Sequence, residues 1–295
     1  MTAVSAEGTS PNLAFRSPRL RLAGSTVVGG LIVLLLVLMA VAPGLLPGRD
    51  VSGLDVANQY APPSSAHWFG TDEVGRDIFT RIVEGTRYSL SMALSIVVIA
   101  AILGTLLGLV AGYAGGWVDQ LIMRSTDIFF SLPTFVVAMA LSVVLGRGMV
   151  SLVFALSVVW WPTYARLVRG MVLAIKERPH VRSARAIGAS NSRILRKHIV
   201  PFMTQELVVR STQDVGYAIV AVSSLSFIGV GAQPPTPEWG LLLFSARNSI
   251  TISWSYPLFP GLMIVLATVG FALLGDGLSG GGSARRRRSG RRGSK

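Results

Sequence analysis

The chain has 295 residues, of which 51% are hydrophobic and only 14% are charged, whereas a soluble domain is about 25% charged. Its mean hydropathy is +0.57, and several uninterrupted apolar runs are long enough to cross the roughly 30 Å hydrocarbon core of a bilayer. This composition excludes an ordinary soluble protein and predicts an all-α polytopic membrane protein.

The basic residues are concentrated in short segments. The net charge of +13 would suggest nucleic-acid binding in a soluble chain, but most Lys and Arg residues lie at 16–21, 166–210 and 285–295. Such clustering in loops and tails is typical of the cytoplasmic side of a membrane protein, so no nucleic-acid partner is expected. The chain has no Cys and three scattered His residues, so no metal site is expected either.

The N-terminal third predicts a tail, one span and a loop. Residues 1–22 are polar and are expected to form a cytoplasmic tail. The apolar run at 23–46 exceeds the hydrophobic region of a signal peptide, so it is predicted to be the first transmembrane helix. Residues 47–87 then form an extracytoplasmic loop, and 71–87 reads as an amphipathic helix because its opposite charges recur at i, i+4. A helix lying at the membrane interface is favoured there over a direct substrate contact.

The remaining apolar runs predict a core at 88–278 with five further transmembrane helices. These spans are expected at 88–118, 128–145, 149–165, 205–228 and 257–274. A charged cytoplasmic segment at 166–204 joins the spans at 149–165 and 205–228. A basic cytoplasmic tail at 279–295 follows the last span. The prediction is therefore six transmembrane helices with both termini in the cytoplasm, because every basic block then falls on one side.

Gly104, Gly108 and Gly112 are spaced four residues apart in the second predicted span. They give that helix one nearly flat face, and small residues of this kind let helices pack closely in lipid. Close helix packing is therefore expected, with substrate binding as the less favoured alternative.

Glu206, Arg210 and Asp214 also recur every four residues, at the start of the fifth predicted span. They share one helix face. One interpretation is that Arg210 pairs with its acidic neighbours near the inner interface. The other is that the three residues line a water-filled part of a pathway, because charges inside a membrane usually face the bundle interior.

The segment 176–201 is the longest strongly charged stretch within the apolar part of the chain. Small residues crowd its middle, and cations flank them. A helix of this composition has a narrow surface that a partner can approach closely. The segment therefore predicts the place where a membrane channel is held by a protein outside the membrane.

Motifs for catalysis are absent from the sequence. It contains no phosphate-binding loop of the G-x-x-x-x-G-K-[ST] type and no Gly-Lys dipeptide. The formal G-x-G-x-x-G match at 275–280 follows a membrane helix rather than a strand, so it carries no weight. We expect a chain that is not an enzyme, and any uphill transport would draw its energy from a partner.

Residues 182–201 resemble the cytoplasmic loop of binding-protein-dependent ABC importer permeases. The family pattern is E-A-A, three residues, Gly, nine residues, I-x-L-P; Ser183 and Ala184 take the two alanine positions, Gly188 the glycine and Pro201 the proline. Arg182 departs from the pattern, because the family usually has Glu there. Further motifs resemble the second, dipeptide/oligopeptide permease C-type subunit of the peptide, oligopeptide and nickel branch. They are FGTDEVGRD (69–77), GGWVD (115–119), RAIGAS (185–190), LSFIGVGAQPPTPEWG (225–240), LFPG (258–261) and LLGDGL (273–278).

This resemblance implies a type I, MetI-like permease fold in the bacterial plasma membrane. The implied partners are a homologous permease subunit, two ATP-binding subunits or one fused pair, and an extracytoplasmic solute-binding protein. ATP and Mg would be held by the ATPase partners, and no cofactor is expected in this chain. The residues implied to couple the permease to the ATPase are Arg182, Ser183, Ala184, Arg185, Gly188, Ala189, Ser190 and Pro201.

The resemblance implies import of peptides, with nickel or haem-like cargo as alternatives. Two readings from other classes are weaker. An autonomous secondary transporter or channel would be expected to carry broken helices and buried coupling charges in both halves. A membrane scaffold without transport would leave the small residues of the charged segment unexplained.

Overall fold

The computed structural model describes residues 19–43 and 53–290, and all of the regular elements within these two ranges are helices. The predicted all-α class is therefore confirmed for the described part of the chain. Residues 1–18, 44–52 and 291–295 lie outside it, and with them parts of both predicted tails, the end of the first predicted span and the start of the predicted outer loop.

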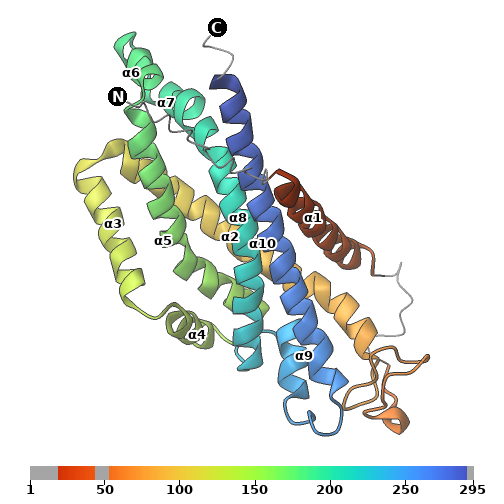
Figure 1. Cartoon of the computed structure of the whole chain (residues 1–295). Coiled ribbons are helices and arrows are strands. Elements are labelled where there is room, and N and C mark those ends of the chain that lie inside the picture. The colour runs from red at the N-terminus through yellow and green to blue at the C-terminus, as the bar shows by residue number, and fades with distance from the viewer. Residues whose placement is uncertain (1–18, 44–52, 291–295) are drawn as a thin grey trace, which may run out of the picture.

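Long helices form the body of the molecule (Figure 1). They are α1 (Arg19–Val41), α2 (Ile78–Ala114), α5 (Met149–Lys176), α8 (Val200–Phe227) and α10 (Ser255–Gly290). Shorter elements connect them: a 3-10 turn η2 (Val56–Asn58), α3 (Gly116–Ser131), α4 (Thr134–Val144), α6 (Pro179–Ala186), α7 (Asn191–Ile194), the π-helical turn η3 (Leu195–Ile199) and α9 (Trp239–Ala246).

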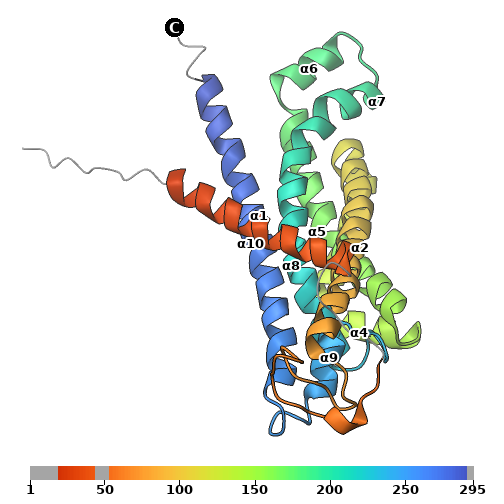
Figure 2. The same cartoon turned by 90° about the vertical axis from the view of Figure 1, so that its right-hand side faces the viewer.

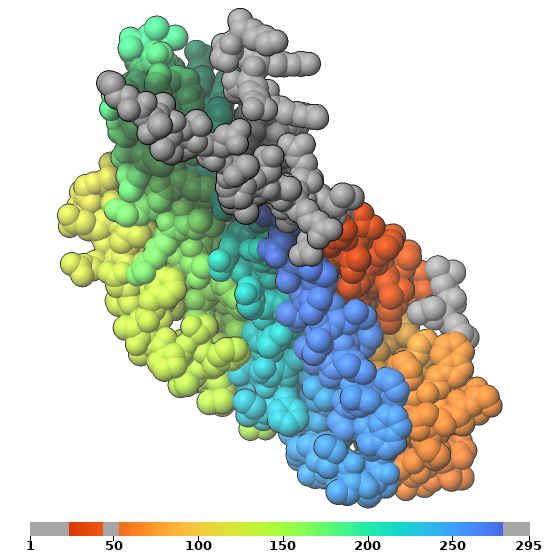
Figure 3. Space-filling view, in the orientation of Figure 1, coloured from red at the N-terminus to blue at the C-terminus, as the bar shows by residue number. Residues whose placement is uncertain are grey.

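The molecule has two distinct ends. Helices α6 and α7 lie at one end, whereas α9 and the loop at 53–77 lie at the opposite end (Figures 1 and 2). We refer to these as the α6 end and the α9 end. Helix α1 crosses the bundle obliquely and packs against α10 and α2, and the space-filling view shows α8 and α10 side by side (Figure 3).

Four of the helical segments are long and apolar enough to cross a membrane: Gly24–Val41, Ile78–Ala114, Met149–Lys176 and Ser255–Ser279. The pair α3 and α4 passes the same test together but is bent by 93°. Helix α8 is long enough, but polar residues such as Arg210, Gln213 and Asp214 interrupt it. The described residues thus contain four candidate membrane spans, or five if the bent pair is one span. The total of six transmembrane helices and the cytoplasmic location of both termini stay predictions.

The glycine ladder of α2 brings this helix into direct contact with α5. A Cβ atom added at Gly104 would lie 2.4 Å from the carbonyl oxygen of Trp161, and one at Gly108 would lie 2.6 Å from that of Ala165. Both distances are shorter than van der Waals contact, so these positions accept only glycine unless the helices move apart. The predicted close packing is confirmed.

The amphipathic helix predicted at 71–87 is wrong in its first half. Helix α2 begins at Ile78 and continues without a break into the span, while residues before it form a loop. Gly70 and Gly75 adopt φ values of +82° and +81°, which a helix cannot contain. The i, i+4 charge spacing that suggested a helix instead closes a tight turn, in which Asp72 binds Arg76.

The third span predicted at 128–145 is also wrong in its form. Helix α3 occupies Gly116–Ser131 and so covers the gap between the spans predicted at 88–118 and 128–145. Helix α4 follows only after a sharp bend. The cause is Pro133, because a proline disfavours helical conformation in the residue before it. Leu132 is accordingly extended, with φ −106° and ψ 144°.

Candidate functional site

The segment predicted to contact a partner forms two short helices at the α6 end, joined by a glycine turn. Gly188 ends α6 with φ +81°. The amide of Ala189 donates to the carbonyl of Ala184 at 3.0 Å, and the amide of Gly188 donates to that of Arg185 at 3.0 Å. This pair of bonds is the Schellman arrangement, which favours glycine at the left-handed position. Gly188 therefore fixes the angle between α6 and the following chain.

The small residues of α6 do not share one open face. Ala184 is buried, with only 6% of its surface exposed. Its neighbour Val181 belongs to an apolar cluster beneath α6 that also includes Ile194. The narrow surface predicted from the small residues of 176–201 therefore does not include Ala184. The remaining residues implied in coupling are exposed, apart from Ala189, which is half-buried: Arg182, Ser183, Arg185, Gly188, Ser190 and Pro201.

Ile187 is the residue that sequence reasoning missed here. It follows α6 directly, beside Gly188, and its side chain is 85% exposed. An apolar side chain that protrudes from a basic helix end has no favourable contact in water. Its side chain is free to enter an apolar pocket on a partner. Its position one residue before the glycine of the RAIGAS motif was the available signal.

Arg182 is neutralised within the chain. Its guanidinium donates to Glu177 Oε2 at 2.6 Å, and both side chains are more than half exposed. This hydrogen bond, together with the positive charge of Arg182, holds the pKa of the Glu177 carboxyl below its usual value. The cation that departs from the family pattern therefore has an anionic partner five residues earlier.

Polar contacts connect the α6 end to the long helices. The hydroxyl of Tyr113, at the end of α2, donates to Asn191 Oδ1 of α7 at 2.7 Å. Lys176 Nζ, at the end of α5, donates to the carbonyl of Gly112 at 3.2 Å. The first bond ties α7 to α2, the second ties α5 to α2, and the apolar cluster beneath α6 and α7 joins them to α5 and α8. Pro201 lies where the wide turn η3 enters α8, and its missing amide hydrogen explains why the regular ladder is broken there.

A cavity of about 610 Å³ opens between α3, α4, α5 and α8. Its lining is largely aromatic and aliphatic, and polar groups are few. The aromatic residues are Phe129, Phe130, Phe135, Trp160 and Tyr217, and the charged ones are Arg210 and Asp214. Its size falls within the range of about 300–1,000 Å³ that is usual for small-molecule sites.

Two of the three charged residues predicted on one face of α8 belong to this cavity. Arg210 Nε donates to Asp214 Oδ2 at 3.0 Å, and Asp214 is fully buried. Glu206, in contrast, is exposed and does not line the cavity. Arg210 therefore pairs with Asp214, as the first interpretation of the sequence predicts, and the two residues also line the cavity. Glu206 neither pairs with Arg210 nor lines the cavity.

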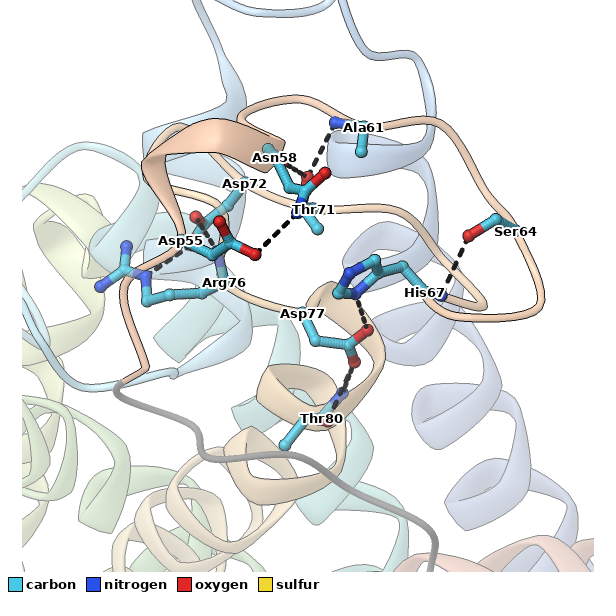
Figure 4. A network of polar contacts seen from close by, with 10 residues as sticks. All are labelled: Asp55, Asn58, Ala61, Ser64, His67, Thr71, Asp72, Arg76, Asp77 and Thr80. Carbon is cyan, nitrogen blue, oxygen red and sulfur yellow. Dashed lines mark hydrogen bonds and ion pairs between the residues drawn. The ribbon is translucent and has the colours of Figure 1, made fainter.

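The FGTDEVGRD motif forms a polar network at the α9 end (Figure 4). Asp72 is fully buried and accepts from Arg76 Nε at 2.7 Å and from Arg81 Nη1 at 2.5 Å. If the i, i+4 spacing of opposite charges in 71–87 lay on a helix, Asp77 would pair with Arg81. Instead it caps α2 by accepting from the amide of Thr80 at 2.8 Å, and it lies 2.9 Å from His67 Nδ1. The motif therefore ties the loop to the start of α2.

A close approach of two backbones explains the glycine within this network. A Cβ atom at Gly75 would lie 1.8 Å from the carbonyl oxygen of Asp55, and the amide of Asp55 donates to the carbonyl of Val74 at 3.1 Å. Only glycine fits there. The motif is thus explained by the folding of the loop, and a direct contact with substrate is not needed to account for it.

Comparison with known proteins gives a consistent result. Residues 104–288 match the family model of the binding-protein-dependent transport system inner membrane component. The chain belongs to this family. It is 40% identical over 253 residues to the "Probable D,D-dipeptide transport system permease protein DdpC" of Escherichia coli K12, which covers 86% of this chain and 85% of that protein. It is 44% identical over 253 residues to the glutathione transport system permease protein GsiD of Pectobacterium atrosepticum, covering 85% and 84%.

The fold of this inner membrane component has a solved counterpart. A chain of the methionine ABC transporter MetNI, in inward-facing conformations, matches with a TM-score of 0.55 and 19% identity, over 66% of this chain and 93% of that chain. The predicted MetI-like ABC permease fold is therefore confirmed. Membership of this family implies that the chain works with a further permease, an ATPase and a binding protein. It also implies that the chain spans a membrane.

Proposed function

We propose that this inner membrane component forms half of the translocation pathway of an ATP-driven importer for small peptides. Its partners are one homologous permease subunit, two ATP-binding subunits or one fused pair, and one extracytoplasmic solute-binding protein. The complex resides in the bacterial plasma membrane, which the chain crosses several times. The chain itself hydrolyses no ATP, and ATP and Mg are held by the partner subunits.

The observation that carries this proposal is the α6 end. There, a short helix, a fixed glycine turn and the exposed Ile187 protrude together. The hydrogen bond of Tyr113 to Asn191 connects this projection to α2. Closure of the ATPase subunits around it would move α2 and α5, and so change access to the cavity beside α5. Switching of this kind between two packed arrangements is a known form of transport cycle.

The choice of peptide as the solute is supported by the similarity to DdpC and GsiD, whose names give a D,D-dipeptide and glutathione. Nickel and haem-like solutes are the alternatives within the same branch. No observation on the described residues favours an autonomous channel or secondary transporter.

Reconstitution of the complete complex in proteoliposomes tests the solute. With the solute-binding protein outside and ATP inside, we expect uptake of a labelled dipeptide or glutathione that requires hydrolysable ATP. Nickel and haem serve as parallel substrates. Peptide uptake that proceeds equally well without ATP would contradict the importer, and ATP-driven uptake of nickel or haem alone would contradict the peptide assignment.

A further inference from the structure

We propose that a groove between α1 and α2 binds one anionic phospholipid of the surrounding bilayer, with the lipid phosphate on Arg87 and an acyl chain along the groove. This site goes beyond the proposed function, because it does not depend on which solute the importer carries. The bound lipid would contact both helices and so join α1 to α2 at the edge of the membrane.

The first argument is the apolar surface of the groove. Helix α1 crosses the bundle obliquely (Figure 2) and leaves a cavity of about 460 Å³ where it passes α2. The apolar lining residues are Val37, Ala40, Val41, Leu90 and Leu94. Val41 is 78% exposed and Leu94 is 41% exposed, so other parts of the described chain do not cover the groove. In a chain that spans a membrane, hydrocarbon is the solvent that such a surface favours.

The second argument is the charge at the mouth of the groove. Arg87 is the charged residue of the lining, and it is exposed. Within the described ranges its guanidinium has no hydrogen bond or ion pair, and Glu84, one turn earlier on α2, does not pair with it. The other polar side chain of the lining, Ser91, donates to the carbonyl of Tyr88 at 3.0 Å. The groove therefore offers one free cation and no competing anion.

A guanidinium is well suited to a phosphate group. It presents several N–H donors in a fixed plane and can form two parallel hydrogen bonds to phosphate oxygens. Free donors beside an apolar groove fit a molecule that is anionic at one end and apolar along the rest. A phospholipid has this chemistry, whereas a soluble anion would leave the groove unused.

The third argument is the position of the groove along the two helices. Residues 88–118 carry no charge, so Arg87 lies where the apolar stretch of α2 begins, toward the α9 end. Val41 is the last residue of α1, and it lines the same groove. Both walls thus reach one edge of the apolar region. The headgroups of a bilayer lie at this level, and the acyl chains lie beside the apolar residues that follow.

The simplest alternative is a solvated arginine that extends into the headgroup region without a fixed partner. It predicts no preference for one kind of phospholipid at this position. The proposed site predicts such a preference, because the ammonium group of a zwitterionic headgroup would meet the positive charge of Arg87, whereas an anionic headgroup would not.

Native mass spectrometry of the complete transporter tests the site. The complex with its partner permease and ATPase subunits is released from nanodiscs of phosphatidylglycerol and, in parallel, from nanodiscs of phosphatidylcholine with the same acyl chains. We expect the wild type to retain one more phosphatidylglycerol than Arg87→Gln, whose occupancy of that lipid should fall by about fivefold or more, as the loss of one arginine at an anionic surface implies. In phosphatidylcholine, the two complexes should retain equal amounts.

Matched variants separate the charge from the groove. Arg87→Lys, which keeps the positive charge, should retain the phosphatidylglycerol. Ser91→Phe should lose it as Arg87→Gln does, because the ring fills the groove while the charge stays. Arg147→Gln is the control, since Arg147 is exposed in the turn between α4 and α5 and does not line the groove; it should retain the lipid.

Three results would overturn the site. The first is equal retention of phosphatidylglycerol by the wild type and Arg87→Gln, which would also be the result if another protein segment covers the groove in the complex. The second is an equal loss in Arg147→Gln, which would indicate a general effect of charge. The third is undiminished retention in Ser91→Phe, which would show that no acyl chain lies in the groove.

Discussion

Gly188→Glu is expected to abolish ATP-driven solute uptake while the protein still inserts and assembles. Gly188 has φ +81° and is exposed beside Ile187. A residue with a Cβ atom in this left-handed conformation costs about 1–2 kcal/mol. The substitution therefore favours a different backbone conformation of the turn and a different orientation of α6. The glutamate would also place bulk and negative charge on the surface proposed to meet the ATPase. We expect at least a tenfold loss of uptake in proteoliposomes that contain the complete complex.

Gly188→Asn provides the matched control, because asparagine tolerates the left-handed conformation better than other residues with a side chain. Apart from its neighbours in sequence, no described residue has an atom within 4 Å of a Cβ at Gly188, so there is room for either side chain. Gly188→Asn should keep most of the uptake. Normal uptake by Gly188→Glu, with normal amounts of the protein in the membrane, would refute the role assigned to this turn.

Asp72→Ala is expected to have the largest effect on stability. Asp72 is fully buried, and Arg81, which it binds at 2.5 Å, is only 4% exposed. Removal of one partner leaves a buried guanidinium without its counter-charge, which costs about 3–5 kcal/mol. The amides of Val74 and Arg76 also lose their acceptor. The free energy of unfolding in detergent, measured by denaturant titration, should fall by this amount.

Glu177→Gln is the control for that experiment. Glu177 accepts from Arg182 at 2.6 Å, and both side chains are more than half exposed; exposed ion pairs of this kind contribute little to stability. Its substitution should leave the free energy of unfolding nearly unchanged. If Asp72→Ala and Glu177→Gln destabilise the protein equally, the buried network at the α9 end does not hold α2 in the way the structure indicates.

The features that the sequence predicts well are those determined by local chemistry over long stretches. The long apolar runs became helices, because in lipid a helix satisfies its own backbone hydrogen bonds. The glycine ladder of α2 also behaved as expected, since Gly104 and Gly108 meet the backbone of α5. In both cases the structure depends on a property repeated along the segment, hydrophobicity in the first and glycine spacing in the second, and not on any single residue.

The predictions that failed depend on single backbone positions. Asp72 and Arg76 have the spacing of a helical ion pair, yet Gly70 and Gly75 turn the chain so that the same spacing closes a loop. Pro133 divides a predicted span into α3 and α4. Charge spacing and hydropathy do not distinguish these outcomes, because they are determined by backbone dihedral angles.

The position of the candidate site in the chain was predicted from the sequence, but not which of its side chains are exposed. Gly188 is exposed at the end of α6, as the sequence predicts, whereas Ala184 is buried. The apolar cluster beneath α6 includes residues of α5, α7 and α8, which no local pattern brings together. Ile187 was overlooked, since a lone apolar residue in a basic segment is not distinctive. Asp214 was found through its helix face, but its complete burial is known only from the packing around it.

The central claim, that α6 is the contact with the ATPase, can be tested by cross-linking. The chain has no Cys, so Ile187→Cys provides a single thiol that can be labelled with benzophenone maleimide in the assembled complex. Ile252→Cys, at the exposed position Ile252 before α10 and therefore at the α9 end, is the control.

On irradiation, the account predicts an adduct of the permease with the ATPase subunit for Ile187→Cys, and none for Ile252→Cys. An absence of that adduct from a complex that still hydrolyses ATP and imports solute, or equal adducts from both ends of the molecule, would contradict it.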